Sequence, residues 1–183
     1  MKENQQAYPT FGWRVLSLHV ISYFAAGILA LIFLNYRQYY DTGTMALLMR
    51  PANSATVAAG AGLQVVNGFF MSLFLFPFRS VFLTGKTGWM KLFFLIFGFA
   101  VFSPQVPGPG TFEGLIYTKI SISEHLHGLP ESLAYSLLFS ILLPAWYKRP
   151  ARLWNILAFT LVFLIILASV AGVLDSMGLL GSH

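Results

Sequence analysis

The chain has 183 residues, of which 57% are hydrophobic and only 9% are charged, whereas a soluble domain carries roughly a quarter charged residues. It contains no cysteine, which excludes disulfides, thiol catalysis, iron–sulfur clusters and thiolate zinc sites. The net charge of +5 does not indicate nucleic-acid binding, because the cations lie at the edges of hydrophobic runs. The composition therefore predicts an integral membrane protein.

The first hydrophobic run, about residues 11–35, predicts a membrane-spanning helix that stays in the mature protein. The uncharged stretch from Val15 to Tyr36 is longer than the roughly 7–15 residues of a signal-peptide core. The pair Tyr39-Tyr40 that follows it is typical of the aromatic belt at a membrane interface.

The second run, about residues 55–77, begins with the small residues of Ala55–Gly62. Small residues permit close approach of helices in lipid. This face therefore predicts contact with a second copy of the chain or with a partner membrane subunit.

The third run, residues 88–103, is short for a hydrocarbon core of about 30 Å unless Lys91 extends its amine to the interface. The charges favour a crossing. Without one, Lys148 and Arg149 would lie on the opposite side of the membrane from Arg79 and Lys86.

Residues 104–129 form an outward segment that opens with the turn Pro107-Gly108-Pro109-Gly110. Its apolar residues favour an interfacial or re-entrant helix over a free loop. The fourth run, residues 130–147, starts at Pro130, a favourable first helical position, and the fifth covers residues 153–174.

The sequence thus predicts one all-α domain over residues 1–180, a polytopic bundle of about five transmembrane helices. The terminal Gly181-Ser182-His183 is typical of residues left by an expression vector, so His183 is excluded from any site. Basic loops are retained in the cytoplasm, which predicts a cytoplasmic N-terminus in a plasma membrane such as the bacterial inner membrane. On the predicted cytoplasmic side lie Lys2, Arg14, Arg79, Lys86, Lys91, Lys148, Arg149 and Arg152 with Glu3; on the other lie Arg37, Arg50 and Lys119 with Asp41, Glu113, Glu124, Glu131 and Asp175.

The outward segment and the start of the fourth run hold a concentration of titratable residues. Glu124 and His127 are three residues apart and Glu131 follows four later, so a continuous helix would place all three on one face. Such sets bind zinc, iron or manganese, which makes these residues candidate ligands of a divalent metal. We favour the alternative that Glu131 stabilises the first turn of the fourth helix and the histidines lie among lipid headgroups.

The same residues support a second functional hypothesis, a membrane enzyme that acts on a lipid-like substrate. Proton transfer at the headgroup level needs a positioned carboxylate or imidazole. The candidate catalytic residues are Glu113, Glu124, His125 and Glu131.

His19 is the ionisable residue inside a hydrophobic run, where polar groups are costly and usually face protein or water. Gln64 and Asn67 lie three residues apart on one face of the second run, and either of them is predicted to be the hydrogen-bond partner of His19. These three residues are candidates for ligand binding, or for joining two helices. Haem is disfavoured, because His125 and His127 belong to the opposite interface.

The chain has no nucleophile elbow, no phosphate-binding glycine loop and no internal repeat. We therefore expect a small, non-enzymatic membrane protein that contacts membrane lipids. It would bind or help move an apolar or small polar ligand, or act as a subunit of a larger membrane complex.

Overall fold

The computed structural model describes residues 7–104 and 107–180, except for the side chain of Arg37. Lys2, Glu3 and Gly181-Ser182-His183, which entered the sequence analysis, lie outside these residues. Within the described ranges the chain is helical and has no strand. Four helical segments there are long and apolar enough to cross a membrane: Tyr8–Phe33, Ala55–Leu83, Ile122–Lys148 and Arg152–Ser176. The prediction of an all-α membrane bundle is confirmed.

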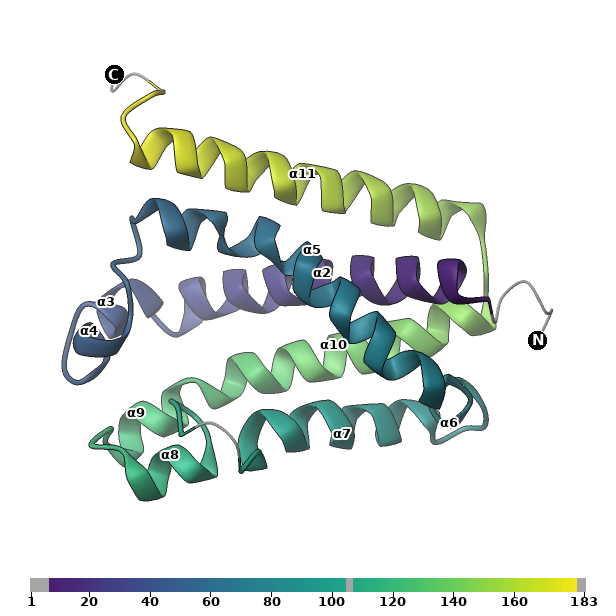
Figure 1. The fold of residues 1–183 in the computed structure, drawn as a ribbon, viewed down its shortest axis with the longest axis horizontal. Helices are drawn as coiled ribbons and strands as arrows, with labels where there is room; N and C mark the ends of the chain where they lie inside the picture. Colours follow the sequence, from purple (N-terminus) through teal and green to yellow (C-terminus); the bar gives the residue numbers. More distant parts are fainter. Residues whose placement is uncertain (1–6, 105–106, 181–183) are drawn as a thin grey trace.

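The long helices run back and forth between two ends of the molecule, joined by short helices (Figure 1). Each predicted hydrophobic run corresponds to one of the longer helices. In chain order the elements are α2 (Tyr8–Phe33), α3 (Tyr36–Tyr40), α4 (Met45–Leu48), α5 (Ala55–Leu75), η1 (Phe76–Phe78), α6 (Arg79–Leu83), α7 (Gly88–Phe102), α8 (Phe112–Tyr117), α9 (Ile122–His127), α10 (Leu129–Lys148) and α11 (Arg152–Ser176).

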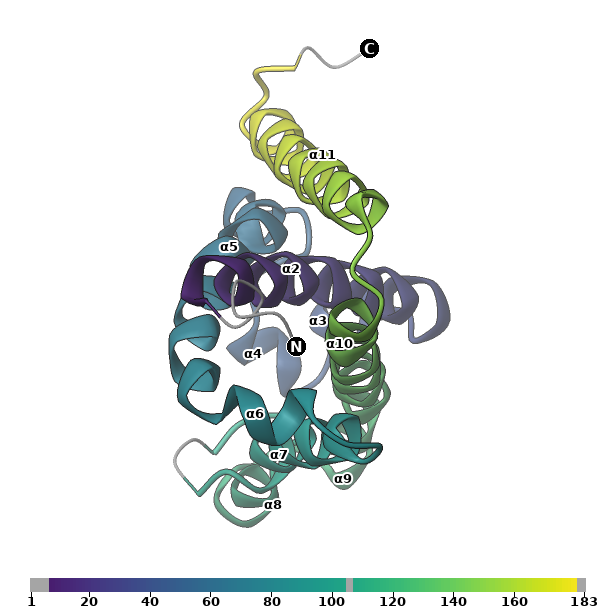
Figure 2. The ribbon, with the colours of Figure 1, turned by 90° about the vertical axis from the view of Figure 1, so that its right-hand side faces the viewer.

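Helix α2 lies at the centre of the bundle and packs against α5, α10 and α11. Helix α11 covers α5 on one side, and α7 packs against α10 on the other (Figure 2). The near absence of an amphipathic pattern in the sequence agrees with this arrangement, because helices in lipid can be apolar on every face.

Helix α7 has 15 residues and is therefore about 22 Å long, shorter than a hydrocarbon core of about 30 Å. It nevertheless runs from the end of the bundle that holds α6 to the end that holds α8 (Figure 1). Lys91, in its first turn, is exposed and has the length to extend toward the interface.

The helix ends follow from local sequence. Pro9 occupies the first turn of α2, where its missing N–H costs nothing. The chain leaves α2 through Asn35, which adopts a left-handed conformation with φ of 49°, a backbone region that asparagine tolerates. The Ser54 side chain caps α5, and Pro77 falls in the 3-10 turn η1 that follows it.

The outward segment forms two short helices at the same end of the molecule as α3 and α4 (Figure 1). Thr111 caps α8, and Ser121 with Glu124 forms a capping box at the start of α9. The segment is therefore helical and packs against α7; its interfacial or re-entrant position stays a prediction.

The close-packed core occupies the half of the bundle where α2 begins and α10 ends. Arg14 is buried there, with its guanidinium 4.2 Å from the ring centre of Tyr147 and 5.4 Å from that of Trp146, an arrangement favourable for a cation over aromatic faces. The buried hydrophobic side chains of this core include Phe11, Val15, Leu18, Leu75, Phe82, Leu92, Phe139, Leu143 and Trp146. The opposite half of the bundle contains a cavity.

Candidate functional site

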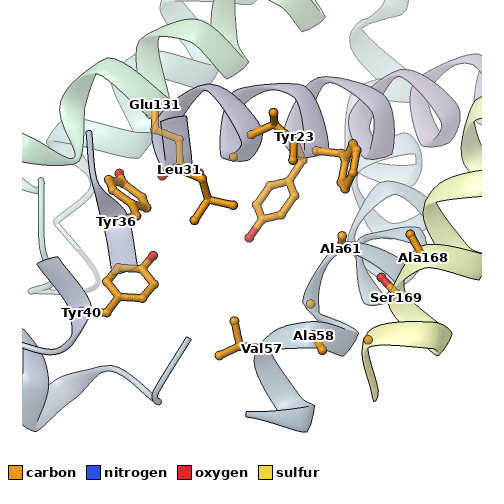
Figure 3. A pocket seen from close by; sticks show the side chains of 15 residues that line it. Tyr23, Leu31, Tyr36, Tyr40, Val57, Ala58, Ala61, Glu131, Ala168 and Ser169 are labelled. Atoms are coloured by element: carbon orange, nitrogen blue, oxygen red, sulfur yellow. The ribbon is translucent and has the colours of Figure 1, made fainter. Parts of the chain in front are cut away.

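The candidate site is a cavity of about 300 Å³ between α2, α3, α5, α10 and α11, at the end of the bundle that carries the acidic residues. Figure 3 shows Tyr36, Tyr40 and Glu131 at one end of this cavity, with Ala61 and Ser169 at the other. The lining side chains are Tyr23, Phe24, Gly27, Ile28, Leu31, Tyr36, Tyr40, Val57, Ala58, Gly60, Ala61, Glu131, Ala168, Ser169 and Gly172.

The polar end of the cavity combines a carboxylate with phenols. Burial and a hydrogen bond to Glu131 raise the pKa of the Tyr36 phenol. Burial, followed by the negative charge of Glu131, raises the pKa of Tyr40 to about 12. Both phenols therefore keep their protons at neutral pH. The hydroxyl of Tyr23 points toward the space between these groups (Figure 3).

The apolar walls are formed where α5 and α11 approach closely. A Cβ on Gly172 would lie 3.2 Å from the Cβ of Ala58, and the Gly62 N–H donates a 2.8 Å hydrogen bond to the Ser169 hydroxyl. This part of the small-residue face Ala55–Gly62 is thus covered by α11 of the same chain. The role of that face toward a second copy or another subunit stays a prediction.

His19 joins three helices through its two ring nitrogens. Its Nε2 lies 3.0 Å from the Gln64 amide oxygen, and its Nδ1 lies 2.6 Å from the Tyr135 hydroxyl. The same amide oxygen accepts a 2.8 Å hydrogen bond from Asn67. Because an amide oxygen only accepts, Nε2 carries the proton and Nδ1 accepts from the phenol. The predicted contact between His19 and Gln64 is present.

This polar network is a neighbour of the cavity and not part of its lining. The ring centres of His19 and Tyr23 are 6.3 Å apart, so the network supports the helix turn that carries Tyr23. A direct role of His19, Gln64 and Asn67 in ligand binding stays a prediction.

The three candidate metal ligands have different partners. Glu124 accepts hydrogen bonds from Ser121 and from the Thr44 N–H. His127 Nε2 donates to the Leu34 carbonyl at 2.6 Å, whereas Glu131 lines the cavity. Over residues 7–104 and 107–180, no group of at least three His, Cys, Asp or Glu residues is arranged to hold a metal ion.

Two further candidate catalytic residues lie away from the cavity. Glu113 is in the first turn of α8. His125 is buried, and its Nδ1 accepts a 3.1 Å hydrogen bond from the Gly110 N–H. Of the four candidate catalytic residues, Glu131 alone contributes to the cavity lining.

Sequence reasoning missed the tyrosines of the site. Tyr36 and Tyr40 follow the first run, where aromatic residues usually mark the interface. Tyr23 stands inside that run, next to Ser22 and without a charged neighbour in sequence. The sequence did contain a signal for this site, because all three tyrosines lie within the first hydrophobic run or directly after it.

Comparison with known proteins found no match: neither a family model, nor a curated protein, nor a solved structure is similar to this chain.

Proposed function

We propose that this membrane protein is a non-enzymatic binding protein, which holds an amphiphilic molecule in the cavity bounded by α2, α3, α5, α10 and α11. The observation that supports this proposal most directly is the composition of the lining, with apolar walls and a small group of convergent polar side chains at one end. Ligand sites commonly have this composition, and the volume of about 300 Å³ is at the lower end of their range.

The proposal extends to the cellular setting of the site. Most of the described basic residues lie near the end of the bundle where α2 begins. This segregation of basic residues favours a cytoplasmic N-terminus. The cavity would then face the outer half of a plasma membrane, such as the bacterial inner membrane. An amphiphile could enter there from the lipid layer with its head near the interface.

A cavity-filling variant tests the proposal. A Cβ on Gly60 would meet no atom within 4 Å, and Gly60 lines the cavity. Gly60→Leu therefore fills the site without a backbone clash. We expect it to weaken saturable binding of radiolabelled ten-carbon amphiphiles to the protein in nanodiscs by about tenfold or more. Empty nanodiscs supply the background.

The matched control is Gly98→Leu in α7, because a Cβ on Gly98 also meets no atom within 4 Å and Gly98 is not in the lining. This variant should bind the probes as the parent protein does. Equal binding by the parent protein and Gly60→Leu, or no saturable binding by the parent protein, would overturn the proposal.

A further inference from the structure

The carboxylate of Glu131 has a special position in the cavity. It is half-buried in the first turn of α10, and its Oε1 lies 3.8 Å from where a Cβ on Gly27 would be. This is an ordinary van der Waals distance, so the carboxylate lies against α2 at Gly27. Among the side chains that the structure describes, Glu131 forms no ion pair with a basic residue.

A partly buried carboxylate without a cation is costly to keep in an apolar setting. The neighbouring Tyr36 phenol reduces this cost but adds no positive charge. The phenols also keep their protons, so they cannot remove the negative charge of the site.

Aromatic rings surround the same end of the cavity. The ring centres of Tyr36 and Tyr40 are 5.3 Å apart with an interplanar angle of 37°, and Tyr23 lies across the space from them (Figure 3). The faces of aromatic rings are electron-rich and attract ammonium groups. A carboxylate beside several tyrosine rings is thus a favourable environment for an organic cation.

The charge of the surrounding end agrees with this chemistry. Five acidic residues and three basic residues belong to the outward segments of the sequence, so the field there attracts cations and repels anions. The remaining lining, which includes Phe24, Ile28 and Ala168, provides an apolar surface for the body of the ligand.

We infer that the ligand is a cationic amphiphile, with an ammonium head held by Glu131, Tyr36 and Tyr40 and an apolar body between α2, α5 and α11. This inference depends on the proposed binding function and names the ligand class that the cavity selects.

Three radiolabelled probes with the same chain length test the inference in nanodiscs of uncharged lipid: decyltrimethylammonium, decanol and decanoate. The parent protein should bind decyltrimethylammonium about tenfold or more tightly than decanol, and decanoate most weakly, as expected for a partly desolvated charge contact. Glu131→Gln should lose the preference for the cation and leave decanol binding within about twofold. Asp175→Asn removes an exposed carboxylate at the same end and should retain the preference.

A second pair of variants applies if Glu131→Gln does not fold. Tyr40→Phe keeps the aromatic face and should retain the preference for the cation, whereas Tyr40→Leu should reduce it about three- to tenfold. Equal binding of cation and decanol by the parent protein would overturn the inference, and so would a preference that persists in Glu131→Gln or in Tyr40→Leu. If decanol binding is still lost in Gly60→Leu, the binding function itself stands; if no probe binds saturably, both proposals fail.

Discussion

His19 is buried among α2, α5 and α10 with a hydrogen-bond partner on each ring nitrogen. A polar side chain inside a membrane bundle is retained at low cost only when such partners are present. The network therefore explains how an imidazole is tolerated at this depth, and it connects helices that have few other polar contacts there.

The contribution of this network can be measured with a double-mutant cycle. We expect His19→Ala and Tyr135→Phe to be coupled by about 0.5–1.5 kcal/mol, the range typical of hydrogen bonds between membrane helices. The free energy of unfolding would be measured in mixed micelles. Tyr117→Phe is the control, because the Tyr117 side chain is exposed and its replacement should change stability little. Additive effects of the two substitutions would contradict a shared interaction.

At the scale of elements, the contact between α2 and α5 depends on Gly68. A Cβ at this position would lie 3.0 Å from the Leu16 Cα and 3.1 Å from the Leu16 carbonyl oxygen. These neighbours are backbone atoms, which cannot rotate away. A methyl group at position 68 would therefore force the two helices apart by a few tenths of an ångström.

Gly68→Ala should lower the free energy of unfolding by about 1–3 kcal/mol, the usual cost of overpacking. Gly60→Ala in the same helix provides the control, because its Cβ has open space and alanine favours the helix by up to about 1 kcal/mol. Unfolding of both variants in mixed micelles checks the prediction. Equal stability of Gly68→Ala and Gly60→Ala would contradict a tight contact at Gly68.

At the scale of the whole molecule, charge is divided between the two ends of the bundle. The described basic residues at the end where α2 begins are Arg14, Arg79, Lys86, Lys91, Lys148, Arg149 and Arg152. The acidic residues Asp41, Glu113, Glu124, Glu131 and Asp175 lie toward the other end. This division depends on α7 crossing the membrane, since α7 separates Lys86 from Glu113.

Cysteine labelling tests that crossing directly, because these 183 residues include no cysteine. Lys86→Cys and Arg149→Cys should react with a membrane-impermeant maleimide from the same side of the membrane, the cytoplasmic side. Asp41→Cys and Glu113→Cys should react only from the other side. Labelling of positions 86 and 149 from opposite sides would mean that α7 does not cross.

Much of the fold was predictable, and less of the site. The limits of the five hydrophobic runs agree with those of the five longer helices, because the hydropathy of a segment depends only on its own residues. The His19–Gln64 contact was also predictable, since polar groups inside apolar runs must find one another. The proposed ligand set Glu124, His127 and Glu131 was harder to judge, because Gly128 separates α9 from α10 and the caps and turns around it give each side chain its own partner.

The amino-acid sequence alone determined that this is a helical membrane protein, where its five longer helices begin and end, and how its charges divide between the two ends. These properties depend on the transfer of each segment from water to lipid and are nearly independent of its neighbours. The tertiary structure decided that Tyr23 of α2, Tyr40 of α3 and Glu131 of α10 meet at one cavity. That meeting depends on how the packed helices are rotated and how far apart they lie. Close contacts between small residues of different helices determine both quantities, and no single segment encodes them.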